Sequence, residues 1–260
     1  MNDVVYKFRD FTNPLHRDIL YHNEIFFAPI DSFNDPFDCG IIPDYERLKN
    51  REQWEIFVKN INLSEQDVVK LNDKYDKDPE EVINNYKTLY LHQQRDTTGI
   101  FSCSKIWDSV LMWSHYSNNH KGFAVGLDSN LMWVKLGDYI SAANSVHYPE
   151  DDKMPSLNPS ANDFETTISN KMIELFYKSK FWCYEEEFRF ISISKEKIKD
   201  HDRVVKIPDE VFAEVILGLN FPHSQQSKLE DICKSKNIPL YRCQKIDGTF
   251  KLKRVPVFTP

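Results

Sequence analysis

The stretch Gly99–Asp128, GIFSCSKIWDSVLMWSHYSNNHKGFAVGLD, predicts a strand, a helix and a second strand in succession. Ile100 to Ser104 alternates apolar and small polar residues, as a half-buried strand does. Apolar residues recur at helical spacing from Ser109 to Tyr116, and the Asn and Gly residues of 118–122 end that helix. Phe123 to Leu127 is a second apolar strand. A hydroxyl-rich strand, an aromatic helix and two histidines thus lie within about 20 residues.

Short alternating segments recur on both sides of this stretch, and turn residues separate them. We predict strands at 4–8, 146–148, 181–194, 204–207, 214–219, 239–245 and 250–256. Helices are expected at 163–179 and 224–236. The remaining predictions are an extended or mixed segment at 19–28 and a surface loop at 149–162. Residues 44–98 contain no glycine and carry apolar residues at helical spacing, so two to three amphipathic helices are expected there. The expected fold is one α+β domain over residues 1–260, with a split, mostly antiparallel sheet and a helical insertion at about 44–98.

Composition narrows the functional classes. The 260 residues are 41% hydrophobic and carry a net charge of −7, which supports a core and argues against a broad electrostatic grip on nucleic acid. The five cysteines show no CxxC spacing, which argues against a disulfide scaffold or a structural zinc site. The first residues do not resemble a signal peptide and no window is apolar enough to span a membrane. A cytoplasmic protein without membrane partners is expected.

Three consecutive glutamates, Glu185-Glu186-Glu187, lie inside the predicted strand at 181–194. The two-residue period of a strand places Glu185, Glu187 and Arg189 on one face. One interpretation is an exposed sheet face with a cross-strand ion pair. The other is a cleft in which a carboxylate orients a sugar hydroxyl or stabilises a developing cation.

Ser102 and Ser104 share one face of the strand in the opening stretch. Hydroxyl groups on a buried strand need hydrogen-bond partners, which either the neighbouring backbone or a ligand can supply. No GxSxG pattern is present, so a serine hydrolase has little support.

The segment Trp113-Ser114-His115-Tyr116 and the nearby His120 supply further polar and aromatic groups. His115 and His120 are five residues apart, which suits two ligands on one helix face poorly, and no third ligand is evident, so no metal site is predicted. His115 is more simply a core or cleft-rim histidine. No GxGxxG or GxxxxGK[ST] motif is present to hold phosphates.

Four segments together resemble the bacterial domain of unknown function DUF2971. They are FNDPFD at 33–38, FSCSK at 101–105, LMWSHYSNNHKGF at 111–123 and FWCYEEEFR at 181–189. The resemblance extends from Tyr6 to the predicted strand at 214–219, and the family's name implies no function.

The chain is also similar to ADP-ribosyltransferases of the Arg-Ser-Glu type. Their three signatures are a basic residue on an early strand, a Ser-x-Ser strand and a Glu-x-Glu near a later strand. The corresponding residues are Lys7 or Arg9, then Ser102-Cys103-Ser104, then Glu185-Glu186-Glu187. The middle residue of the second signature is usually Thr and is Cys here, and the spacing between the signatures is longer.

This second resemblance implies NAD as the substrate and assigns roles to residues. Arg9 or Lys7 would bind the pyrophosphate or ribose side of NAD. Ser102 or Ser104 would hold the nicotinamide ribose, with Tyr116 or Trp113 stacked on nicotinamide and His115 lining the cleft. Glu187 would stabilise the oxocarbenium-like centre that forms as nicotinamide leaves, and Glu185 would position the acceptor.

The leading function is therefore ADP-ribosyl transfer from NAD to a macromolecule, or NAD cleavage, which would suit a toxin or a phage-defence effector. The alternatives are a non-catalytic nucleotide-binding or sensor module and a nuclease or other hydrolase that uses His115 and His120. The sequence leaves the acceptor and the oligomeric state open.

Overall fold

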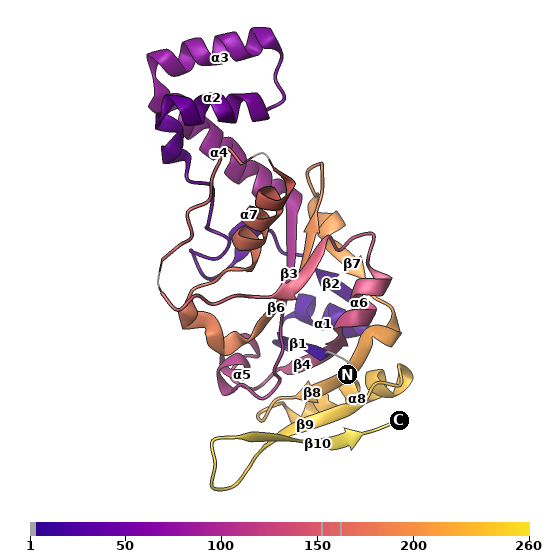
Figure 1. Cartoon of the computed structure of the whole chain (residues 1–260). Helices are drawn as coiled ribbons and strands as arrows, with labels where there is room; N and C mark the ends of the chain where they lie inside the picture. Colours follow the sequence, from indigo (N-terminus) through magenta and orange to yellow (C-terminus); the bar gives the residue numbers. More distant parts are fainter. Residues whose placement is uncertain (1–3, 152, 162) are drawn as a thin grey trace. The chain divides into compact units, whose positions relative to one another are not determined.

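The computed structural model describes residues 4–151, 153–161 and 163–260, and the chain forms two compact units (Figure 1). The sheet unit comprises Met1–Ala28, Thr98–Val146 and Phe181–Pro260. The helical unit comprises Pro29–Thr97 and His147–Lys180. The helical unit therefore contains most of the predicted insertion at 44–98 together with two flanking segments.

Eight strands of the sheet unit form one sheet in the order β10-β9-β8-β4-β1-β3-β6-β5. Their bounds are β1 Val4–Arg9, β3 Thr98–Ser104, β4 Phe123–Asp128, β5 Ala142–Ser145, β6 Glu187–Ile193, β8 Phe212–Leu217, β9 Leu240–Lys245 and β10 Leu252–Phe258. Every neighbouring pair is antiparallel except β8 and β9. The prediction of an α+β fold with a mostly antiparallel sheet is confirmed.

Strand β1 joins the two halves of this sheet. It pairs with β4 along its whole length, from Val4↔Asp128 to Arg9↔Phe123, but with β3 only at Tyr6↔Ser104. The ladder between β1 and β3 is therefore limited to one residue pair, and the side chain of Lys7 lies beside that short ladder.

The sheet unit also contains helices α1 Pro14–Tyr21, α5 Val110–Tyr116, α6 Ser129–Lys135 and α8 His223–Ser235. A small second sheet pairs β2 Glu24–Phe26 with β7 Val204–Lys206. Two of the unit's 3₁₀ turns are η4 Asp200–Arg203 and η5 Asp209–Val211. The segment at 19–28, expected to be extended or mixed, contains the end of helix α1 and the whole of strand β2. The Asn13 side chain accepts a hydrogen bond from the Leu15 backbone N–H, and Pro14 occupies the first turn. These residues therefore start a helix and do not merely interrupt a strand.

The two faces of the large sheet carry different cores. On one face, Val5, Phe101 and Phe190 belong to a large aromatic and aliphatic core. On the other face, Tyr6 and Phe8 pack with residues of α5. We call this second side the α5 face.

Gly122 makes a close backbone approach at the end of β1. A Cβ atom at this position would lie 2.0 Å from the carbonyl oxygen of Arg9. Gly218 is equally restricted, because a Cβ there would lie 2.3 Å from the carbonyl oxygen of His120. These contacts hold the turn at 118–122 against both β1 and the end of β8.

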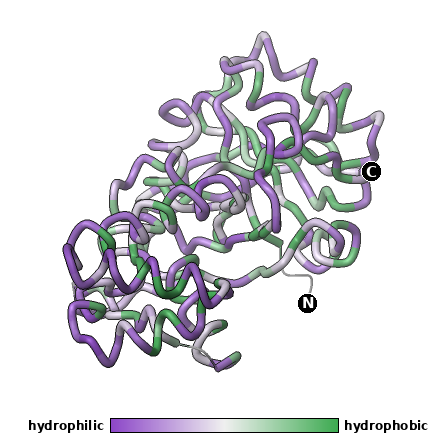
Figure 2. The backbone as a smooth tube through the Cα atoms, turned by 90° about the horizontal axis from the view of Figure 1, so that it is seen from above, coloured by the Kyte–Doolittle hydropathy of each residue, from purple (hydrophilic) through white to green (hydrophobic). Residues whose placement is uncertain are grey.

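The helical unit is built from η1 Ile30–Ser32, η2 Tyr45–Lys49, α2 Arg51–Asn60, α3 Glu65–Lys77, α4 Pro79–Thr97 and α7 Phe164–Phe176. Trp54 is fully buried at its centre and stacks on Tyr75 with ring centroids 4.1 Å apart. Ser64 caps α3 by accepting a hydrogen bond from the Asp67 backbone N–H, as the capping-box pattern predicts. The tube in Figure 2 changes between purple and green along its helical coils, as expected of amphipathic helices.

Within the described part of the chain, none of the helices combines the length and apolar character needed to cross a membrane.

Candidate functional site

The first two signatures lie on strands β1 and β3 of the sheet unit, and the third ends at Glu187, the first residue of β6. β1, β3 and β6 are adjacent in the strand order. Ser104 pairs with both Tyr6 and Glu187, and Ser102 pairs with Arg189. Because directly paired residues project to the same side of a sheet, Ser102, Ser104, Glu187 and Arg189 all belong to the α5 face.

Lys7 and Arg9 alternate with Tyr6 and Phe8 along β1, so they belong to the opposite face. Arg9 therefore does not share a sheet face with Glu187. Lys7, unlike Arg9, is close enough to the carboxylates of Glu187 and Glu185 for their charges to affect its pKa. Its ammonium donates a hydrogen bond to the Ser102 carbonyl oxygen and lies 4.9 Å from the centre of the Phe101 ring.

Lys7, Arg9 and His16 form a cluster of partly buried basic groups, which we call the basic cluster. Burial, followed by the charge of Arg9, lowers the pKa of Lys7 to about 8, and the charges of Cys103, Glu187 and Glu185 oppose this shift. Burial lowers the pKa of Arg9 to about 10. Burial and then the positive charge of Arg9 lower the pKa of His16 to about 4.

Within the described part of the chain, Arg9 has no matching anion. Among the described residues, no side chain or carbonyl accepts a hydrogen bond from the Arg9 guanidinium, and no carboxylate forms an ion pair with it. The His16 Nδ1 accepts a hydrogen bond from the Asp10 backbone N–H at 3.2 Å, which suits a neutral imidazole. Desolvated cations of this kind are costly unless an anion binds near them, so the cluster is suited to a phosphate-bearing ligand.

Glu187 and Arg189 form a buried bidentate ion pair. Arg189 Nε lies 2.7 Å from Glu187 Oε1 and Arg189 Nη2 lies 3.0 Å from Glu187 Oε2. The guanidinium is 0% exposed and Glu187 is also buried. This excludes the interpretation of an exposed sheet face, although a buried pair is compatible with either a structural or a catalytic carboxylate.

Glu185 is not on strand β6, which corrects the predicted strand at 181–194. Residues Lys180–Glu185 form the 3₁₀ helix η3, and Glu186 has φ of 43°, so the strand begins only at Glu187. The Glu185 carboxylate is buried and accepts a hydrogen bond from the Tyr116 hydroxyl. Because Glu186, with its left-handed backbone, lies between them, the carboxylates of Glu185 and Glu187 have different surroundings although they are two residues apart.

The two serines of β3 have different environments. The Ser104 hydroxyl donates to the Ile106 carbonyl at 3.0 Å and accepts from the Ile106 N–H at 3.2 Å, so the backbone satisfies it. The Ser102 hydroxyl oxygen is buried and has no hydrogen-bond partner in the structure. Ser102 is thus the serine with a donor and acceptor still available for a ligand.

Trp113 is a core residue. It is 0% exposed, packs edge-on against Phe8 with ring centroids 5.0 Å apart, and donates its indole N–H to the Trp107 carbonyl at 2.7 Å. The His120 ring stacks on the same indole, with the two ring centroids 6.3 Å apart. In this arrangement neither face of Trp113 is open to nicotinamide.

His115 is exposed at the end of α5, and its ring centroid lies 6.4 Å from that of Tyr116 and 6.0 Å from that of Tyr184. His120 instead lies beside Ser114, and the Ser114 hydroxyl is 3.3 Å from His120 Nε2. Burial lowers the pKa of the His120 imidazole. The two histidines therefore have separate surroundings, and Tyr116 is the aromatic residue of α5 in direct contact with a candidate carboxylate.

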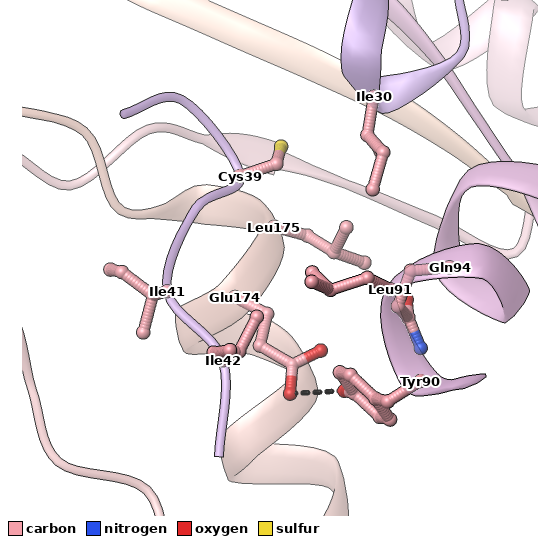
Figure 3. A pocket seen from close by; sticks show the side chains of 9 residues that line it. All are labelled: Ile30, Cys39, Ile41, Ile42, Tyr90, Leu91, Gln94, Glu174 and Leu175. Carbon is pink, nitrogen blue, oxygen red and sulfur yellow. Dashed lines mark hydrogen bonds between the residues drawn. The ribbon is translucent and has the colours of Figure 1, made fainter. Parts of the chain in front are cut away.

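The helical unit contains a separate small pocket of about 260 Å³ (Figure 3). It is lined by Ile30, Cys39, Ile41, Ile42, Tyr90, Leu91, Gln94, Glu174 and Leu175. The buried Glu174 accepts a hydrogen bond from the Tyr90 hydroxyl and pairs with Lys171 at 3.0 Å. Because protein groups already compensate this carboxylate, the pocket carries no unmatched charge.

The sequence interpretation missed two members of this constellation. His16 belongs to the basic cluster, and the signal for it was the Asn13-Pro14 helix start, which brings the first turn of α1 close to the end of β1. Tyr184 contacts His115, but no sequence pattern distinguishes it from the other aromatic residues of its segment.

Comparison with known proteins supports one of the two family resemblances found in the sequence. No curated protein and no solved structure matches the chain significantly. Residues 112–190 match the model of a family described as "Protein of unknown function (DUF2971)". This segment contains His115, Tyr116, Glu185 and Glu187. Over these residues, the chain is similar to the DUF2971 family.

Proposed function

We propose that the sheet unit binds NAD and transfers its ADP-ribosyl group to a macromolecule or to water. One observation supports the proposal: Lys7, Ser102 and Glu187 come from three neighbouring strands, and the Lys7 ammonium donates a hydrogen bond to the Ser102 carbonyl oxygen. Glu185 ends the 3₁₀ helix just before the third of these strands. The resemblance to Arg-Ser-Glu transferases implies this adjacency. A role as a toxin or defence effector would follow from the activity.

In the proposed reaction, Lys7, whose ammonium lies beside the short β1–β3 ladder, binds the pyrophosphate. Arg9 is on the opposite face of the sheet from Glu187 and has no role in this reaction. The unpartnered Ser102 hydroxyl bonds to the nicotinamide ribose. The bond between C1 of this ribose and the nicotinamide nitrogen breaks, and nicotinamide leaves with the electron pair. Glu187 stabilises the resulting oxocarbenium-like centre.

The acceptor then completes the transfer. Its nucleophilic oxygen or nitrogen supplies the electron pair of the new bond to C1 and loses a proton. Glu185, held by Tyr116, is the carboxylate proposed to position the acceptor and to take this proton.

Incubation with NAD labelled in the adenylate part tests the activity. The protein is expected to release nicotinamide and to label at least one of a protein extract, DNA or RNA, or to release free ADP-ribose. The catalytic control is the Glu187→Gln variant. Absence of nicotinamide release with all three acceptors and without any acceptor would contradict the proposal.

The pH dependence of NAD binding tests the role of Lys7. Its pKa of about 8 in the free protein means that the ammonium loses its proton as pH rises through 8, and with it the attraction for pyrophosphate. Affinity is expected to fall about tenfold between pH 7 and pH 9, in proportion to the charged fraction. A Lys7→Arg variant stays charged in this range, so its affinity should change little. Equal slopes for both proteins would reject Lys7 as the titrating group.

A non-catalytic nucleotide-binding or sensor module is the second candidate. The basic cluster favours it, because Arg9 needs an anion whether or not NAD is cleaved. NAD that raises the melting temperature without nicotinamide release would identify this alternative. For a hydrolase based on His115 and His120, the different surroundings of the two rings give no support.

A further inference from the structure

Three side chains with metal-binding chemistry converge where α1 ends and β2 begins. Asp18, His22 and Glu24 each offer one ligand atom, and these atoms all lie within 4.8 Å of one another. Across the residues described by the structure, this is the one group of three or more such side chains that meets this separation. It lies outside the constellation discussed above.

Local structure explains the convergence. Asp18 and His22 are four residues apart, one turn along α1, and Asp18 Oδ1 lies 3.1 Å from His22 Nδ1. Asn23 has φ of 59° and reverses the chain, and its side-chain amide donates to Ile207 O at 3.0 Å and to Asp209 Oδ1 at 2.7 Å. Glu24 follows at once as the first residue of β2.

The third side chain of the group, Glu24, lies on the strand that follows the helix. In the ladder of the small sheet it is directly opposite Lys206. Nevertheless, within the described part of the chain, its partly buried carboxylate accepts no hydrogen bond and forms no ion pair. The carboxylate lies instead with one oxygen within 4.8 Å of the ligand atoms of Asp18 and His22, so it can bind a cation together with them.

We propose that Asp18, His22 and Glu24 bind one divalent first-row transition-metal ion, with Zn²⁺ as the first choice. Two ligand atoms that are each about 2.0–2.2 Å from a tetrahedral zinc ion lie about 3.3–3.6 Å apart. The Asp18–His22 separation of 3.1 Å is close to this range. One imidazole and two carboxylates suit Zn²⁺ or Co²⁺, and three protein ligands leave a coordination position for water. The ion would fasten the end of α1 to the start of β2.

Calorimetric titration of the metal-free protein with Zn²⁺, together with the absorption spectrum of the Co²⁺ form, tests the site. We expect one ion per chain and a Co²⁺ spectrum without a thiolate band. His22→Ala should weaken Zn²⁺ binding about 100-fold. Loss of a group that only supports a ligand weakens metal binding about 10–100-fold, and His22 would bind the ion directly. Glu24→Gln should also weaken binding while leaving the Asp18–His22 contact in place.

His201→Ala is the matched control, because His201 also contacts a neighbouring carboxylate, that of Asp202 at 3.2 Å, and is exposed. It lacks a third ligand, so its removal should leave the affinity unchanged. Circular dichroism checks that each variant is folded. Absence of stoichiometric binding, equal affinity of His22→Ala and the unmodified chain, or a thiolate band would each overturn the proposal. None of these measurements depends on NAD turnover.

Discussion

Glu187→Gln is expected to reduce NAD turnover about 10²–10³-fold, the usual loss for one electrostatic group at a reacting centre. It should also destabilise the protein, because the amide retains a hydrogen bond to Arg189 but removes the negative charge of this buried ion pair. Removing one member of a buried ion pair costs about 3–5 kcal/mol, and the retained bond places this variant at the lower end. Turnover assays and urea unfolding measure the two effects.

The double variant Glu187→Gln/Arg189→Met separates catalysis from folding. The second substitution also removes the buried positive charge of the pair, so stability should largely recover. Turnover should remain low, since the carboxylate is still absent. Full activity of well-folded Glu187→Gln would reject the catalytic assignment. Recovery of activity in the double variant would show that the loss came only from the unfavourable buried charge.

Trp113→Ala is expected to destabilise the sheet unit by about 3–5 kcal/mol, as for other fully buried tryptophans. The change removes the contacts with Phe8 and His120 and leaves the Trp107 carbonyl without its indole donor. The matched control is Trp133→Ala, whose side chain is 45% exposed and should cost less than about 1 kcal/mol. Urea unfolding compares them.

A small effect of Trp113→Ala on stability, combined with loss of NAD binding, would contradict the core assignment. It would restore the interpretation of Trp113 as a stacking residue. Equal destabilisation by both tryptophan variants would show that burial does not decide the cost at these positions.

Local patterns predicted the elements well where one rule dominated. Alternation located β3, and an apolar run located β4. The strands expected at 239–245 and 250–256 correspond to β9 and β10, and Gly248 in the turn between them has φ of 72°. The same rule failed at 181–186, because one left-handed residue, Glu186, breaks an alternation that looks continuous in the sequence. A backbone conformation of this kind in a non-glycine residue has no reliable sequence signal.

The candidate site was predictable in its residue types and much less in its contacts. Both serines share a face, as alternation requires, yet only Ser104 is satisfied by the backbone, because the chain turns back at Ile106. The position of Arg9 on the face opposite Glu187 depends on the register Tyr6↔Ser104, which joins residues almost 100 positions apart. No local pattern specifies such a register.

Strand β1 also has a consequence for how the chain is made. It lies between β3 and β4, and both are synthesised after it. Its six-pair partner β4 ends at Asp128, so at about 5–20 residues per second the ribosome needs roughly 6–24 s after finishing β1 to supply that partner. The strand has neither neighbour until β3 is made, and it lacks its six-pair partner until β4 is complete. Because both pairings join residues about 90 or more positions apart in the chain, we expect the centre of the sheet to form late and slowly.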